Sequence, residues 1–211
     1  MRRCAECDLD NQQNRDHPIC IPLPSNDIKG CIISRDPTSA FIEPWKEPII
    51  TKGNFKFSNG EVPPKWLCKR IQSFMGFTPD SVEAKKLHTF FDLNCYWTHF
   101  HKCPTDKHGK GFPQFSYPNG KICADKWFEF ECIKYDLNDK ILILLGRDVE
   151  RYFQERPDHP LLKSKYVFFL PHPSAANCGK GWSWNKCKSP DDPDLIKLNE
   201  RLTKLMACIT K

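Results

Sequence analysis

A continuous apolar run near the middle of the chain restricts the possible folds more than any other feature. Residues 140–145 (Lys-Ile-Leu-Ile-Leu-Leu) carry no polar side chain after the lysine, and Gly146 follows them directly. A run of this length is typical of a strand that is covered on both faces, as the central strands of parallel sheets are. It is too short to cross a bilayer. We therefore expect a buried parallel strand over 140–145.

Strand and helix signals alternate along the rest of the chain. Stretches rich in β-branched and aromatic residues predict strands over 30–34, 94–100 and 166–170. Alternating strands and helices indicate an α/β fold with a mainly parallel four-stranded sheet. We expect one domain over 1–211, in which residues 1–28 form an irregular lead-in. The expected helices, which have apolar residues at helical spacing, are 63–77, one capped by Asp80, 122–135, 147–154 and a C-terminal helix with a stripe over 195–209.

The composition is that of an ordinary globular protein with a mildly basic charge. Of the 211 residues 39% are hydrophobic, and the formal net charge is +6. This charge is compatible with a nucleic-acid partner but does not require one. Because we recognise neither a secretory signal nor a membrane-spanning segment, we expect an intracellular protein, cytoplasmic or nucleoid-associated. We expect it to be a monomer that does not bind membranes.

Twelve cysteines are a large number for a chain that we expect to be intracellular. Cys4 and Cys7 form a CxxC pair near the start of the chain. The chain is long enough to bury a core without disulfide bonds, so the spacing favours metal or cluster ligation by some thiols and burial of the others. Both a structural zinc ion and an iron–sulfur cluster suit such thiols.

Two residues with suitable chemistry directly follow expected strands. Asp36 precedes Pro37 after the first strand, and His172 begins a His-Pro-Ser segment after the last one. Either segment alone is explained by a turn, in which Asp or Ser accepts a backbone hydrogen bond. Ligands of α/β proteins bind beyond the carboxyl ends of the strands. A carboxylate and an imidazole on neighbouring strand ends therefore indicate acid–base or electrostatic chemistry on a bound substrate.

Four short motifs lie at the expected strand ends. They are Ser-Arg-Asp-Pro-Thr at 34–38, Tyr-Trp-Thr-His-Phe-His-Lys-Cys-Pro at 96–104, Leu-Leu-Gly-Arg at 144–147 and Leu-Pro-His-Pro-Ser-Ala-Ala-Asn at 170–177. In this order they resemble the motifs of the uracil-DNA glycosylase superfamily. The resemblance is strongest to its iron–sulfur (family four) branch, but the Asp-Pro pair is similar to that of family one. With the CxxC pair, it covers roughly residues 4 to 177.

The resemblance implies a fold, an activity and a cofactor. The fold would have three α/β/α layers, with the sheet in the middle. The activity would be that of a monofunctional DNA glycosylase in base excision repair, which flips a deaminated base, above all uracil, out of DNA and hydrolyses its N-glycosidic bond. The cofactor would be a [4Fe–4S] cluster, with structural zinc as the alternative. The four ligands would be Cys4, Cys7, Cys103 and Cys123.

The resemblance also implies roles for individual residues. Asp36 would orient or activate water and stabilise the cationic sugar, and His172 would bind an oxygen of the departing base. The residues expected to bind the base are Arg35, Phe55, Phe57 and His99. The residues expected to contact the DNA are Lys102, Ser174, Lys180, Trp182 and Trp184. One of the two tryptophans would fill the space that the flipped nucleotide leaves.

Two positions depart from the family pattern and affect the expected substrate. His99 replaces the asparagine that pairs with uracil, and Thr38 stands where a bulky aromatic follows the Asp-Pro pair. A neutral imidazole cannot offer the paired donor and acceptor of an amide. We therefore expect slower or less exclusive removal of uracil, with activity on a deaminated purine such as hypoxanthine or xanthine.

Two other functions fit parts of the same sequence. A non-catalytic, metal-bearing nucleic-acid-binding module on this fold would use the basic loops, but it has no need for both Asp36 and His172. A hydrolase of small nucleosides would need both residues, but it has no need for the basic, tryptophan-containing loop after His172.

Overall fold

The four expected strands form one sheet in the computed structural model, which describes residues 27–37, 63–103, 105, 114–164, 166–173, 184 and 191–210. All strand pairs are parallel, and the order in the sheet is β2-β1-β3-β4. The expected parallel sheet is therefore confirmed, with the apolar run as a central strand. The strands are β1 (Gly30–Ser34), β2 (Cys95–His99), β3 (Ile141–Leu145) and β4 (Val167–Leu170).

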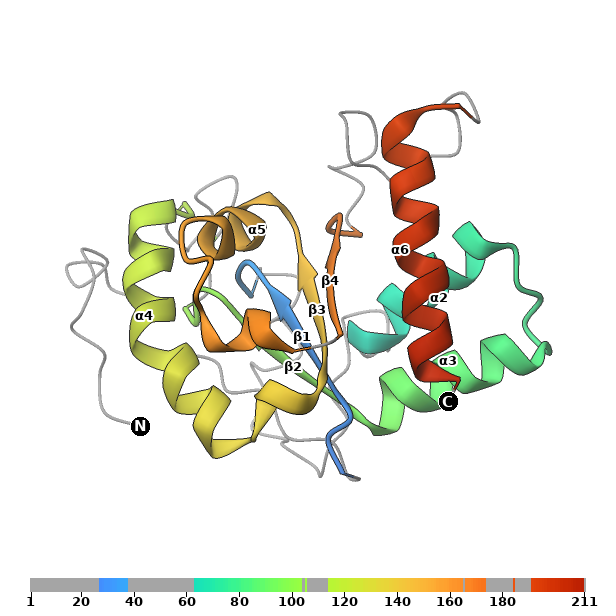
Figure 1. Cartoon of the computed structure of the whole chain (residues 1–211), viewed down its shortest axis with the longest axis horizontal. Coiled ribbons are helices and arrows are strands. Elements are labelled where there is room, and N and C mark those ends of the chain that lie inside the picture. The colour runs from blue at the N-terminus through green and yellow to red at the C-terminus, as the bar shows by residue number, and fades with distance from the viewer. Residues whose placement is uncertain are drawn as a thin grey trace.

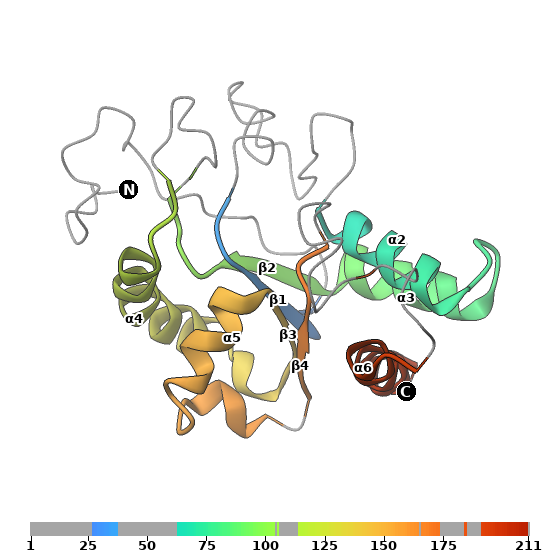
Figure 2. The same ribbon diagram turned by 90° about the horizontal axis from the view of Figure 1, so that it is seen from above.

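Helices cover both faces of this sheet and complete the expected three-layer α/β/α arrangement (Figures 1 and 2). One face is covered by α2 (Pro63–Met75), α3 (Val82–Leu93) and α6 (Pro193–Ile209). The other is covered by α4 (Tyr117–Lys134) and α5 (Arg147–Gln154). Two short 3-10 helices, η3 (Leu137–Asp139) and η4 (Pro160–Lys163), flank β3 and β4.

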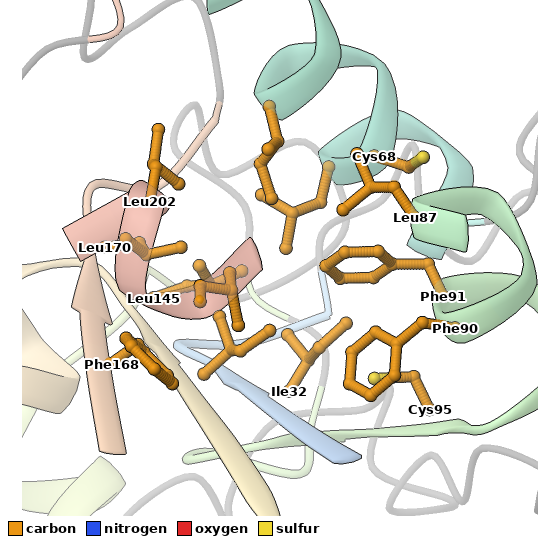
Figure 3. Packing of buried hydrophobic residues seen from close by; sticks show 14 of the residues in the cluster. Ile32, Cys68, Leu87, Phe90, Phe91, Cys95, Leu145, Phe168, Leu170 and Leu202 are labelled. Atoms are coloured by element: carbon orange, nitrogen blue, oxygen red, sulfur yellow. The ribbon is translucent and has the colours of Figure 1, made fainter. Parts of the chain in front are cut away.

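The alternation of side chains along each strand divides the core into two clusters. Ile32 packs with Leu87 and Phe91 of α3 (Figure 3). Its neighbours in β1, Cys31 and Ile33, pack on the opposite face with the helices α4 and α5. Successive side chains of a strand point to opposite faces, so both clusters draw on the same short strands. This two-sided burial is the physical reason for the apolar sequence of β3.

Helix starts differ from the expectation at two places. Helix α3 is capped by Ser81 rather than Asp80, because the Ser81 hydroxyl accepts a hydrogen bond from the Ala84 amide at 3.1 Å. Helix α4 begins at Tyr117, five residues before the predicted start. Gly120 lies inside its first turns, where a Cβ atom would collide with the ring of Phe100. Glycine is unfavourable in a helix, so this position is set by packing.

None of the described helices is both long enough and apolar enough to span a membrane.

Candidate active site

The carboxyl ends of all four strands meet at one edge of the sheet, because every strand runs in the same direction. Asp36 follows β1, His99 ends β2, Gly146 follows β3 and His172 follows β4. Ligands of parallel α/β sheets bind at this edge. The structure thus places both expected catalytic residues at the edge where a site is expected.

The ends of β1 and β4 are not adjacent, which corrects our expectation of neighbouring strand ends. The strand β3 lies between them in the sheet. It ends at Leu145 and is followed by Gly146, whose φ of 91° favours glycine over any residue with a side chain. A Cβ atom at Gly146 would lie 3.5 Å from the Cβ atom of His172. The glycine therefore keeps side-chain atoms out of the space beside His172.

Both carboxylate oxygens of Asp36 are held by neighbouring side chains. The Nε of Arg35 donates to Oδ1, and the hydroxyl of Thr105 donates to Oδ2. The guanidinium of Arg35 lies 4.5 Å from the centre of the Phe115 ring, and its Nη1 lies 3.7 Å from Oδ2 of Asp148. Asp36 is thus a buried carboxylate with a fixed orientation and a cation beside it.

His172 is held in its neutral form. Loss of solvation and the positive charge of Arg35 together lower the pKa of its imidazole to about 4, against the opposing effect of Asp36. His172 is still partly exposed, so a ligand can reach it. A neutral imidazole near an open edge can donate a hydrogen bond without carrying a charge into the site.

Two further histidines lie buried behind this edge. Burial lowers the pKa of His99, and the positive charge of Lys102 lowers it further. Burial also lowers the pKa of His101 to about 4, partly offset by Asp36 and the Cys103 backbone. Neither ring nitrogen of His101 makes a hydrogen bond of normal geometry. At neutral pH the site therefore contains neutral imidazoles around one buried carboxylate.

The segment after β2 runs alongside the loop that carries Asp36. The amides of Phe100 and His101 donate to the carbonyls of Ser34 and Arg35 at 2.7 and 2.8 Å. The amide of Thr105 donates to the carbonyl of Pro37 at 3.2 Å. Residues 101–105 are therefore attached at both ends to the loop around Asp36.

Lys102 does not face solvent, which corrects the expectation that it contacts DNA. Its ammonium group lies 2.7 Å from the carboxylate of Glu131 in α4 and also donates to the hydroxyl of Thr98. The side chain lies against the Phe128 ring, 5.2 Å from its centre. Only 5% of Lys102 is exposed, so the charge joins β2 to α4 rather than reaching a phosphate.

Trp184 is part of the core, which corrects the expectation that its ring contacts DNA. Its ring packs edge-on against Phe74 of α2, with 5.9 Å between the ring centres (87° between planes). Its Nε1 donates to the carbonyl of Pro171 at 2.9 Å. Since Pro171 directly precedes His172, Trp184 fixes the start of the segment that carries the imidazole.

Two of the four expected cysteine ligands lie close together. The thiol of Cys123 in α4 accepts a hydrogen bond from the amide of Lys102 at 3.2 Å, and Lys102 directly precedes Cys103. Hydrogen bonds to the sulfurs of an iron–sulfur cluster help to set its reduction potential, but a buried cysteine without a cluster can accept the same bond. The described residues contain no group of three or more His, Cys, Asp or Glu side chains arranged for a metal ion. Cys4 and Cys7 lie outside the described residues, so these residues hold only two of the expected ligands.

Several other expected site residues also lie outside the part of the chain that the structure describes. They are Phe55, Phe57, Ser174, Lys180 and Trp182. Their expected roles stay predictions.

The structure adds three residues to the site that the sequence analysis did not select. Thr105 binds Asp36, Phe115 supports Arg35, and His101 is buried near Asp36. His101 lies within the 96–104 motif, so its position beside His99 was a usable signal. Thr105 and Phe115 contact residues about 70 or more positions away, and no local pattern indicates such contacts.

Comparisons with models of protein families, with curated proteins and with solved structures gave no significant match to this chain. A proposal for its function therefore rests on the residues and geometry of the site.

Proposed function

We propose that this protein is a DNA glycosylase that flips a deaminated base out of DNA and hydrolyses its N-glycosidic bond. Uracil is the first candidate substrate, and Asp36 and His172 are the catalytic pair. The observation that carries the proposal is the placement of these two residues at one edge of the sheet, on either side of Gly146.

The separation of the pair suits a nucleoside bound between them. Neighbouring strands lie about 4.8 Å apart, so β1 and β4 are about 10 Å apart across β3. Gly146 contributes no side chain to this interval. A nucleoside in this space would have its sugar near Asp36 and its base near His172.

Asp36 suits the charge that develops on the sugar. As the glycosidic bond breaks, the electron pair leaves with the base and the sugar carbon becomes cationic. A fixed, buried carboxylate stabilises this cation and orients water for addition to the same carbon. The proton that this water loses balances the charge of the base anion, so the products are the free base and a sugar that carries a hydroxyl on that carbon. The hydrogen bonds from Arg35 and Thr105 hold the carboxylate in place before the reaction begins.

His172 suits the charge that develops on the leaving base. The departing base becomes an anion, and much of its charge lies on a carbonyl oxygen. The lowered pKa of His172, about 4, makes the imidazole a neutral donor at physiological pH. A neutral donor binds that oxygen more strongly as its charge grows, so the contact favours the transition state over the bound substrate.

DNA recognition and the cofactor complete the proposal. Arg35 is retained as a base-binding residue, together with a ring from Phe55 or Phe57. His99, of which only 1% is exposed, is retained on the motif resemblance alone. Ser174, Lys180 and Trp182 are retained as DNA contacts, supported by the basic net charge of +6. A [4Fe–4S] cluster bound by Cys4, Cys7, Cys103 and Cys123 would have a structural role, and zinc stays the alternative.

The test is release of the base from defined oligonucleotides. Purified protein is incubated with single- and double-stranded DNA containing uracil, hypoxanthine or xanthine, and abasic sites are cleaved with alkali. Asp36→Asn and His172→Gln should each slow base release at least about 100-fold while affinity for the damaged DNA changes little. Matched controls are Asp158→Asn and His88→Gln, which lie away from this edge and should react as the wild type does.

Two results would contradict the proposal. If no base is released although damaged DNA binds, the protein is a binding module. If free nucleosides are cleaved and DNA is not, it is a small-molecule hydrolase.

A further inference from the structure

We propose that Thr105 is a positioning residue that sets the orientation of the Asp36 carboxylate for the reaction. The inference rests on the proposed function, because it assigns Thr105 a part in the same reaction. Thr105 is 69 residues away from Asp36 in sequence and comes from the segment after β2, on a different strand end.

Thr105 contacts the Asp36 loop through both its backbone and its side chain. Its amide donates to the carbonyl of Pro37 at 3.2 Å, and its hydroxyl donates to Oδ2 of Asp36. Only 2% of Thr105 is exposed, so water competes little for this hydroxyl. A hydrogen bond from a buried donor with an anchored backbone has little freedom to change direction.

The second partner of Asp36 is less suited to fixing its orientation. The side chain of Arg35 is 41% exposed and also approaches Asp148, with 3.7 Å between Nη1 and Oδ2. It has four rotatable bonds, whereas a β-branched threonine has one stiff torsion. Arg35 therefore supplies charge beside the carboxylate, and Thr105 determines how the carboxylate is turned.

The position of Thr105 in its segment supports this role. The amides of His101 and Thr105 both donate to carbonyls of the Asp36 loop, and Lys102 and Cys103 lie between these two residues in the sequence. Lys102 is held by the partly buried Glu131, so the intervening part is also anchored. Two backbone hydrogen bonds, at His101 and at Thr105, and the ion pair of Lys102 therefore restrain the residues around Thr105.

The test compares Thr105→Val with Thr105→Ser. Valine keeps the shape and removes the hydroxyl, whereas serine keeps the hydroxyl. A hydrogen bond to a charged group is worth a factor of about 10 to 100 in rate. Thr105→Val should slow single-turnover base release by about that factor at saturating DNA, with DNA affinity within about threefold of wild type. Thr105→Ser should restore most of the rate, and the exposed Thr89→Val should leave it unchanged.

A second readout separates this inference from the proposed function. The ¹³C chemical shift of the Asp36 carboxylate should change in Thr105→Val and return toward the wild-type value in Thr105→Ser. This measurement needs no DNA, so a protein without glycosylase activity can still show that Thr105 orients Asp36. Lack of base release by the wild type would overturn the proposed function alone.

Two outcomes overturn the role of Thr105. One is a Thr105→Val variant with an unchanged rate and an unchanged Asp36 signal. The other is equal loss of rate, DNA affinity and thermal stability in both variants, because serine then fails to rescue and the role is structural only.

Discussion

The Nζ atom of Lys102 lies 2.7 Å from each carboxylate oxygen of Glu131. The hydroxyl of Thr98 donates to the same carboxylate at 2.7 Å, so the acidic partner is held from two sides. A buried charge that loses its partner is strongly destabilising, whereas an apolar pair of similar size in the same place often is not. The ion pair therefore matters chiefly because each charge compensates for the burial of the other.

Lys102→Met should lower the free energy of unfolding by about 3 kcal/mol, because Glu131, whose side chain is only 14% exposed, would be left without its cation. The double variant Lys102→Met/Glu131→Leu should recover much of this loss. Urea unfolding measures both values, with the exposed Lys134→Met as the control. Near wild-type stability combined with a salt slope of DNA binding reduced by about one would instead indicate a phosphate contact by Lys102.

The pH dependence of base release should follow His172. Its pKa of about 4 keeps the imidazole neutral from pH 8 down to about pH 5. The single-turnover rate should change little over this range on account of His172, and protonation should begin to alter the contact with the base only near pH 4. A rate profile with a His172-dependent midpoint near 6.5, absent in His172→Gln, would contradict the neutral imidazole.

The stability of the protein should fall as the pH is lowered, partly because of His101. Its pKa is about 4 in the folded protein and near 6.5 in the unfolded chain, so the unfolded state binds more protons between these values. Lowering the pH through this window therefore favours unfolding, by about 2 kcal/mol between pH 7 and pH 5 for this one group. Urea unfolding of His101→Leu at both pH values should show a smaller decrease. An equal decrease in wild type and variant would exclude His101 as a source.

The thiols of Cys103 and Cys123 should be needed for metal content. Anaerobically purified protein should be brown and contain iron and sulfide in equal amounts, about four of each per chain. Cys103→Ser and Cys123→Ser should lose the colour, while Cys208→Ala on α6 should keep it. Loss of the group should also speed amide exchange at His101 and Thr105, because Cys103 lies between them. A colourless protein with one zinc ion per chain would favour the alternative site.

His99→Asn should shift the substrate preference toward uracil. An amide offers uracil a donor and an acceptor side by side, whereas the neutral imidazole of His99 has them on opposite sides of its ring. The ratio of the rates for uracil and hypoxanthine, measured under single-turnover conditions, should rise in the variant. Strict specificity for uracil in the wild type, with no change in the variant, would mean that His99 does not face the base.

The sequence alone predicted those strands and helices whose buried side chains recur at the spacing of a strand or a helix. The strand β3 and the helix α5 lie almost where the pattern predicts them. A strand buried on both faces has a continuous apolar sequence, and a helix buried on one face has apolar residues at helical spacing. The start of α4 was missed because Pro118 and Gly120 are unfavourable in most helix interiors. Here Pro118 occupies the first turn, and Gly120 accommodates the ring of Phe100.

The sequence alone also placed Asp36 and His172 at one edge of the sheet, because parallel strands bring all their carboxyl ends together. Only the tertiary structure decided that β3 separates them, that Thr105 holds Asp36, and that Lys102 is buried against Glu131. Strand order and these contacts depend on how segments distant in the chain pack together. The residues next to a lysine or a threonine in the sequence do not show whether its side chain contacts water or a carboxylate of the protein. Tertiary packing alone therefore determined the partners of Lys102 and Thr105.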